Sequence, residues 1–132
     1  MPRDARSFLE DALGEIARSE PEADRALRAA LRGLTARLSD GARSFVLQAG
    51  GEGWCFCDGE RTADIVVAFD EAVILDLIEG VLTLHEAILG ERIIVFGPID
   101  NICKFYDALF VFLEGLLRAS GASALLERFR KA

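Results

Sequence analysis

The sequence predicts an α+β fold: a mixed, mainly antiparallel sheet of four to five strands, covered by five to six helices, with an apolar cavity between the layers. Three observations predict it. Segments with helical periodicity occupy both ends of the chain. Short segments rich in branched or aromatic residues lie between them, bounded by glycine turns. A late helix, over residues 98–119, presents more apolar surface than packing on a sheet requires.

The length and charge of the chain narrow the class of protein. Its 132 residues fit one domain, which we divide into a helical cover (1–41), the sheet with its cavity helices (42–119) and a C-terminal helix (120–132). The net charge is −7, and residues 44–103 carry eleven acidic side chains against two basic ones. Because this centre repels phosphate backbones, we expect no nucleic-acid partner.

Targeting segments and metal motifs are not evident in the sequence. No apolar run approaches the ~18–20 residues that cross a bilayer, and the first residues lack the apolar core of a signal peptide, so we expect no transmembrane segment and a cytoplasmic protein. Cys55 and Cys57 should share one face of a strand, but packing explains them better than a metal does, because the chain has a single histidine. We therefore expect neither a metal nor a cofactor.

The first forty residues are expected to form two amphipathic helices. In the first, apolar residues recur at helical spacing from Phe8 to Ala17. Ser19 and Glu22 have capping-box spacing, which predicts the start of the second helix, with Pro21 in its first turn. One apolar stripe then continues to Leu38, so this helix should end at residues 40–41; its members are Leu27, Leu31, Leu34 and Leu38.

The middle of the chain has the character of strands. Residues 44–49, 54–57 and 63–69 are short and rich in branched or aromatic side chains, and turn signals separate them. Three consecutive strands with short turns predict an antiparallel meander.

Capping residues mark the helices that follow. Asp70 should cap a helix over residues 72–79, and Thr83 with Glu86 has the spacing of a capping box that opens a second, short helix. Residues 92–96 then form an apolar strand, which we expect to be covered on both faces.

The helix over residues 98–119 is the most informative element. Lys104, Asp107, Glu114 and Arg118 form a polar stripe, and apolar side chains extend over about half of the circumference. Packing against both the sheet and a neighbouring helix explains this surface. The alternatives are a ligand cavity or a dimer interface. A final short helix follows Gly121.

The order of these elements resembles the sterol carrier protein type-two family. Trp54 falls in the second strand, the pair Ala63 and Asp64 opens the third, and the run 87–97 has that family's pattern of alanine, glycine, strand and glycine. The similarity covers about residues 42–117. It implies a sheet packed against helices around an apolar tunnel, and binding of sterols, acyl chains or isoprenoid-like molecules.

We therefore predict a binding or carrier protein for a hydrophobic small molecule, such as a lipid, a sterol-like compound, or an isoprenoid or polyketide intermediate. The predicted ligand-binding side chains are all apolar and come from the meander, the short helix and the long helix: Trp54, Phe56, Leu84, Ile88, Ile102, Phe105, Leu109, Phe112, Leu113 and Leu116.

Two alternatives remain open. The first is an enzyme of the cyclase or isomerase type that acts on such a metabolite inside the cavity, for which the weak catalytic candidates are Tyr106, His85, Asp107 and Cys103. A helix-end or packing role explains each of these four better. The second is an accessory subunit of a biosynthetic complex that forms a homodimer through its surplus apolar helix surface.

Overall fold

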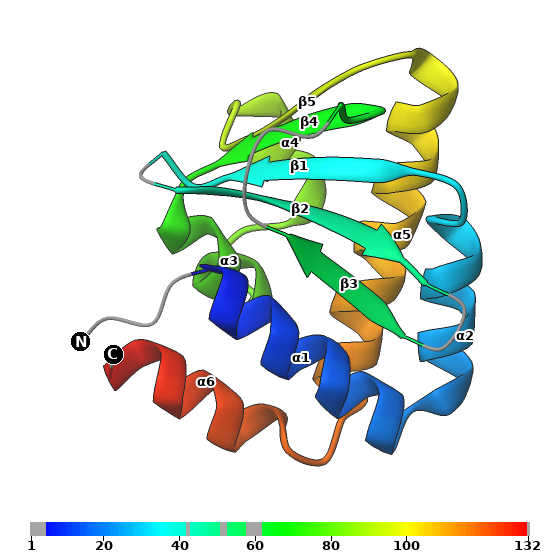
Figure 1. The fold of residues 1–132 in the computed structure, drawn as a ribbon. Coiled ribbons are helices and arrows are strands. Elements are labelled where there is room, and N and C mark those ends of the chain that lie inside the picture. Colours follow the sequence, from blue (N-terminus) through cyan, green and yellow to red (C-terminus); the bar gives the residue numbers. More distant parts are fainter. Residues whose placement is uncertain (1–4, 42, 51–52, 58–61, 132) are drawn as a thin grey trace.

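The computed structural model describes residues 5–41, 43–50, 53–57 and 62–131. They form six helices and one five-stranded mixed sheet, an α+β fold as predicted (Figure 1). The elements follow one another as α1 (Ala5–Ser19), α2 (Pro21–Ala30), β1 (Thr35–Ser39), β2 (Ser44–Ala49), β3 (Trp54–Cys57), β4 (Ile65–Phe69), α3 (Glu71–Ile78), α4 (Leu84–Leu89), β5 (Ile93–Phe96), α5 (Ile99–Arg118) and α6 (Ala122–Lys131).

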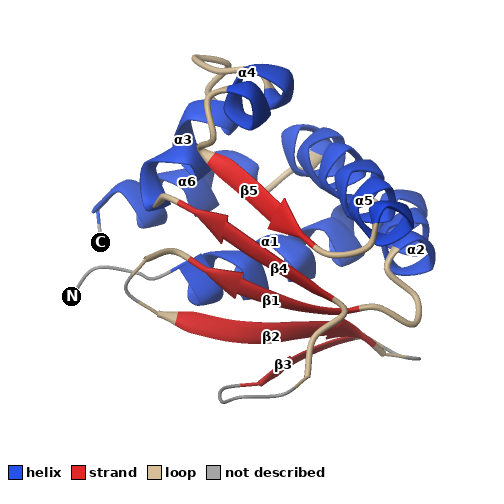
Figure 2. Ribbon diagram, turned by 90° about the horizontal axis from the view of Figure 1, so that it is seen from above, coloured by secondary structure: helices blue, strands red, loops and turns tan. Residues whose placement is uncertain are grey.

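The sheet has the strand order β3-β2-β1-β4-β5, which Figure 2 shows from above. Strand β1 pairs antiparallel with β2 and parallel with β4, and the β2–β3 and β4–β5 pairs are antiparallel. One buried face runs across the strands: Leu38 lies beside Phe45 on one side and Val67 on the other, and all three side chains are buried. This face forms one wall of the core.

The first strand of the sheet was missed by the sequence analysis. The Leu34–Leu38 stripe was expected to continue the second helix, but α2 ends at Ala30 and Gly33 takes a left-handed φ of 79°, which breaks the helix. Residues 35–39 then alternate between half-buried and buried side chains, the period of a strand. Leu34 and Leu38 fit helical spacing, but the buried Ala36 between them reveals the alternation.

The predicted meander was therefore wrong in its membership. Its three strands were expected to be consecutive, yet β4 does not pair with β3; it pairs with β1 and β5. The meander is β1–β2–β3, and β1 separates β2 from β4 because it occupies the centre of the sheet. The turn between β1 and β2 uses the Asp40-Gly41 signal that was assigned to a helix end: an Asp40 oxygen accepts the Arg43 backbone N–H at 2.9 Å.

Two further details differ from expectation. Ser19 does not form a capping box with Glu22, since the N-cap of α2 is Glu20 and no side chain caps it; the Ser19 hydroxyl lies 3.1 Å from that of Ser120 instead. The last strand is only partly covered on its second face: Ile93 is buried on one face, whereas on the other Ile94 is half-buried and Phe96 is 57% exposed.

Helix packing completes the core. Helix α5 packs against α1 and α2, and α6 packs against α1, where the rings of Phe8 and Phe129 lie 4.6 Å apart between centroids. Gly115 permits a close approach of α5 to the preceding helices, because a Cβ at this position would lie 3.1 Å from the Cβ of Ala23. The helices therefore form one layer beside the sheet, and the space between the two layers holds the core.

Candidate hydrophobic pocket

A partly open pocket lies between the sheet and the helices, with a volume of about 100 Å³. Four helices and the sheet contribute to its wall, and all of the lining side chains are apolar or aromatic. They are Leu9 and Leu13 of α1; Leu27 and Leu31 in and after α2; Leu38, Leu47, Trp54, Val67, Phe69 and Ile93 of the sheet; Val73, Ile74, Leu77 and Ile78 of α3; and Phe105, Ala108, Leu109, Phe112 and Leu113 of α5.

The long helix supplies its share of this wall through simple periodicity. Its five lining residues stand at positions i, i+3, i+4, i+7 and i+8 from Phe105, which places them on one side of the helix. Phe105 and Phe112 are buried, whereas Leu109 and Leu113 are only half-buried. The rings therefore anchor α5 in the core, and the two leucines form the more accessible part of the wall.

The chemistry available in the pocket is limited by its composition. None of the lining residues carries an ionisable group or a hydroxyl. Each methylene that such a wall removes from water contributes about 0.8 kcal/mol. An enclosed apolar space on the order of 150 Å³ accepts a benzene-sized guest. A space of about 100 Å³ therefore suits a short alkyl segment, and a longer tail requires the half-buried leucines to move or the tail to leave through the open side.

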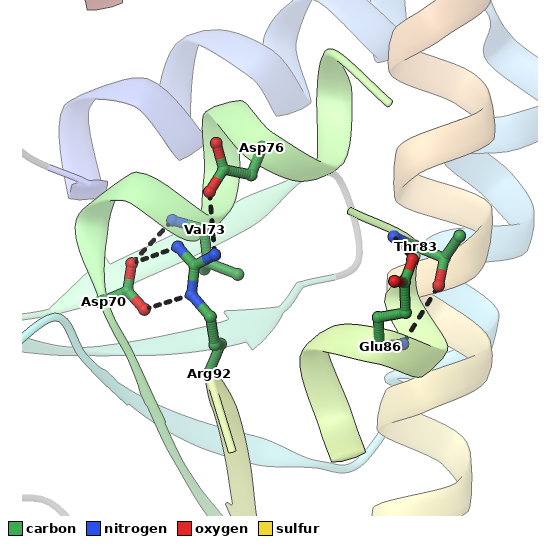
Figure 3. Close-up of polar contacts among 6 residues, drawn as sticks. All are labelled: Asp70, Val73, Asp76, Thr83, Glu86 and Arg92. Carbon is green, nitrogen blue, oxygen red and sulfur yellow. Dashed lines mark hydrogen bonds and ion pairs between the residues drawn. The ribbon is translucent and has the colours of Figure 1, made fainter. Parts of the chain in front are cut away.

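Helix α3 is fixed against the sheet by a network of charged groups (Figure 3). Asp70 caps the helix, as predicted, by accepting the Val73 backbone N–H at 2.9 Å. Arg92, just before β5, donates from Nε and Nη2 to the two carboxylate oxygens of Asp70, both at 2.9 Å, and from Nη1 to Asp76 at 2.9 Å. The edge strand and α3, which both supply wall residues, are thereby tied to each other.

The charges in this network stabilise one another. The hydrogen bonds from Arg92 hold the pKa of Asp70 below its usual range, and the two carboxylate partners of Arg92 raise the pKa of Arg92 further.

At the next helix, the predicted capping box of α4 is present: Thr83 Oγ1 accepts the Glu86 N–H at 3.1 Å, and Glu86 Oε1 accepts the Thr83 N–H at 3.0 Å (Figure 3). These bonds lower the pKa of Glu86.

Trp54 has a distinctive place in the wall. It is the single tryptophan of the chain and lies in β3, opposite Ala49 of β2. Its indole Nε1–H is buried and finds no hydrogen-bond acceptor among the described residues. The indole is therefore a natural spectroscopic reporter for the contents of the pocket.

The structure places five of the ten predicted ligand-binding residues in the wall: Trp54, Phe105, Leu109, Phe112 and Leu113. The other five lie elsewhere. Phe56 packs its ring 6.0 Å from that of Phe45, Leu116 is fully buried in the core, and Ile102 lies half-buried on α5 outside the pocket. Leu84 and Ile88 belong to α4, which packs against β5.

The wall residues of α1, α2, α3 and strands β1, β2, β4 and β5 were not predicted from the sequence. A signal for α3 was present, because Val73, Ile74, Leu77 and Ile78 have the i, i+1, i+4, i+5 spacing of one helical face. Periodicity does not show whether an apolar helix face packs against the sheet, packs against another helix or lines the pocket.

The four catalytic candidates lie outside the pocket wall. His85, Cys103 and Asp107 are exposed, and Tyr106 is half-buried, with a pKa raised by burial. The sulfur atoms of Cys55 and Cys57 lie 3.6 Å apart on the same face of β3. Within the described ranges, no three or more His, Cys, Asp or Glu side chains are grouped so as to hold a metal ion.

Among the residues that the structure describes, no single helix is long and apolar enough to cross a bilayer. Helices α5 and α6 together reach the length and composition, but the chain bends by 106° between them.

Comparison with known proteins identifies the fold. No protein-family model and no curated protein matches the chain. Among solved structures, the ubiquinone synthesis protein UbiJ-SCP2 is 21% identical with a TM-score of 0.60, over 89% of this chain and 95% of that one. The sterol carrier protein domain 2 of Helicoverpa armigera is 16% identical with a TM-score of 0.57, over 86% and 95%. Sterol Carrier Protein 2 Like 2 from Aedes aegypti is 13% identical with a TM-score of 0.54, over 77% and 93%.

Proposed function

We propose that this chain, which has the fold of the sterol carrier protein 2 structures, binds and carries a hydrophobic small molecule in the pocket between its sheet and helices. Lipids, sterol-like compounds, and isoprenoid or polyketide intermediates form the ligand class. The observation that carries the proposal is the uninterrupted apolar wall, which α1, α2, α3, α5 and the sheet build together. We also propose that the 132 residues act as one domain.

Burial of a hydrocarbon tail supplies the affinity. A tail of eight methylenes contributes at most roughly 6 kcal/mol before the cost of association is subtracted, and this requires that the half-buried leucines move so that the whole tail is buried. Because no lining side chain is charged, a carboxylate or other polar head group gains nothing by entering and belongs at the open side. The wall thus selects for apolar length and shape rather than for a particular functional group.

The shared fold supports the same ligand class. Two of the solved structures described above are named sterol carrier proteins, and the third is named a ubiquinone synthesis protein. Sterols and ubiquinone are both largely hydrocarbon, so these names and the apolar wall of this chain agree in chemistry.

Quenching of the Trp54 fluorescence tests the proposal. We expect 11-bromoundecanoic acid to quench the single tryptophan at micromolar concentration, because its bromine enters the wall that contains the indole. Quenching should saturate, and unbrominated undecanoic acid should reverse it by competition. Linear quenching that the unbrominated acid does not reverse would show collisions from solvent and would contradict the proposal.

A further inference from the structure

The outer face of α5 carries a straight line of exposed apolar residues, which we name the α5 stripe: Ile99, Cys103, Phe110 and Leu117. Ile99 is 70% exposed, Phe110 57% and Leu117 61%. Their spacings of four, seven and seven residues place all four within about 40° of one another around the helix, along about 27 Å of its length. None of them lines the pocket.

Packing among the residues that the structure describes does not account for this line. The neighbours α1, α2 and α3 meet α5 on the side of its buried residues, Phe105, Ala108 and Phe112 among them. Single exposed apolar side chains are common on protein surfaces, but several in register along one helix are typical of a contact surface.

Four of the five charged residues on one flank of the α5 stripe are arranged symmetrically; the fifth, Asp107, is also exposed and has Val111 at the mirrored position. Asp100 and Arg118 stand nine positions on either side of residue 109, and Lys104 and Glu114 stand five positions on either side of it. Each pair combines one acid with one base. All four side chains are exposed, and none forms an ion pair with another residue of the described ranges.

This symmetry has a geometric consequence for a second copy of the chain. A two-fold axis perpendicular to α5 near residues 109 and 110 sets two such helices antiparallel and brings the same flank of each together. Asp100 then lies level, to within about one residue, with the second copy's Arg118, and Lys104 with its Glu114. Along the α5 stripe itself, Phe110 meets Phe110 and Cys103 meets Leu117. A parallel arrangement brings opposite flanks together and leaves these charges without partners.

We propose that two copies of this chain associate through antiparallel contact of their α5 stripes. The apolar line supplies the buried centre of the interface, and the four charge pairs set its direction and register. This interaction surface goes beyond the proposed ligand binding and does not require an occupied pocket.

Sedimentation of the full-length chain tests the contact. The wild type should show a concentration-dependent dimer, and Phe110→Glu should weaken association at least about tenfold, because a carboxylate would be buried at the two-fold axis. Val81→Glu is the matched control, since Val81 is 72% exposed and lies outside the α5 stripe. A wild type that stays monomeric at high micromolar concentration, or equal association of the two variants, would overturn the proposal. So would a monomer that binds neutral lipid vesicles through Phe110, because the occupant would then be a membrane.

Charge exchange tests the direction of the contact. Asp100→Arg and Arg118→Asp should each weaken the homodimer, because each places like charges opposite one another. An equimolar mixture of the two variants should form a heterodimer with affinity close to that of the wild type, since every facing pair is again opposite in sign. Failure of the mixture to recover association would exclude the antiparallel register.

A thiol placed by design tests the register. In a Cys55→Ser/Cys57→Ser background, Leu117→Cys should oxidise to a covalent dimer through Cys103, which faces position 117 of the second copy. Leu89→Cys is the control, as Leu89 is 70% exposed on α4. Equal dimer yields from the two thiols would contradict the register.

Discussion

Arg92 donates two parallel hydrogen bonds of 2.9 Å to the carboxylate of Asp70, and the same carboxylate caps α3. One aspartate thus joins the start of the edge strand to the helix that supplies four pocket residues. Bidentate pairs of this kind restrict geometry more than single contacts do. The position of α3, and with it the shape of the pocket, therefore depends on a residue that lies outside the apolar wall.

Asp70→Asn should make the melting temperature depend less on pH in the acidic range. The folded-state pKa of Asp70 is lowered by Arg92, so the carboxylate contributes stability above its unfolded pKa of about 3.9, and this contribution is lost as pH falls through the folded pKa. Asparagine keeps the cap but removes the charge. Melting temperatures should differ most near neutral pH and converge in acid. The lowered pKa values of Glu15 and Glu86 are common to both proteins and cancel in the difference. A difference that is constant with pH would contradict this role.

Thr83→Ala should destabilise the chain by about 1 kcal/mol through loss of one half of the α4 capping box. Chemical denaturation measures this change, and Thr83→Ser is the control that retains the hydroxyl. If alanine and serine are equally stable, the hydrogen bond to Glu86 contributes nothing measurable.

Leu116→Ala should distinguish a role in core packing from a role in ligand binding. Leu116 is fully buried and does not line the pocket, so the deletion should cost about 2–5 kcal/mol in unfolding free energy and leave the affinity for undecanoic acid unchanged. Calorimetric titration at a temperature where the variant remains folded checks the second part. A large loss of affinity in the folded variant would place Leu116 at the binding surface, where the sequence analysis expected it.

Leu109→Trp should fill the pocket without unfolding the chain. Leu109 is half-buried in the wall, so an indole at this position has room to occupy ligand space, whereas in a solid core the same change would cost roughly 1–3 kcal/mol. Calorimetry with undecanoic acid should show at least about tenfold weaker binding. Leu89→Trp on exposed α4 is the matched control and should bind as the wild type does. Equal affinities in the two variants would move the site away from Leu109.

Local chemistry made several elements predictable from the sequence. Asp70 and Thr83 predict the starts of their helices because the carboxylate of Asp70 and the hydroxyl of Thr83 each accept a backbone N–H three residues along the chain. The buried face of α5 was predictable from periodicity, since Phe105 and Phe112 are seven residues apart and therefore lie on the same side of the helix. The resemblance to sterol carrier proteins is confirmed at the level of the fold.

What the sequence did not reveal depends on contacts between distant segments. The parallel pairing of β1 with β4 joins Ala36 to Ile65, and no short-range pattern encodes such a pair. The same limit applies to the site: α4 looked like a wall helix because Leu84 and Ile88 are apolar, but its packing against β5 keeps them outside the pocket. Periodicity identifies a buried face, and only the assembled fold decides what that face touches.

Mass spectrometry under non-denaturing conditions tests the central claim most directly. The chain should be purified from cells without detergent or organic solvent, in parallel with Leu109→Trp. We predict that the wild type carries a hydrophobic molecule of defined mass, which organic extraction releases, and that the variant is bare. Two bare proteins, together with a wild-type melting temperature that fatty acids, sterols and quinones all leave unchanged, would contradict the claim that this pocket holds a ligand.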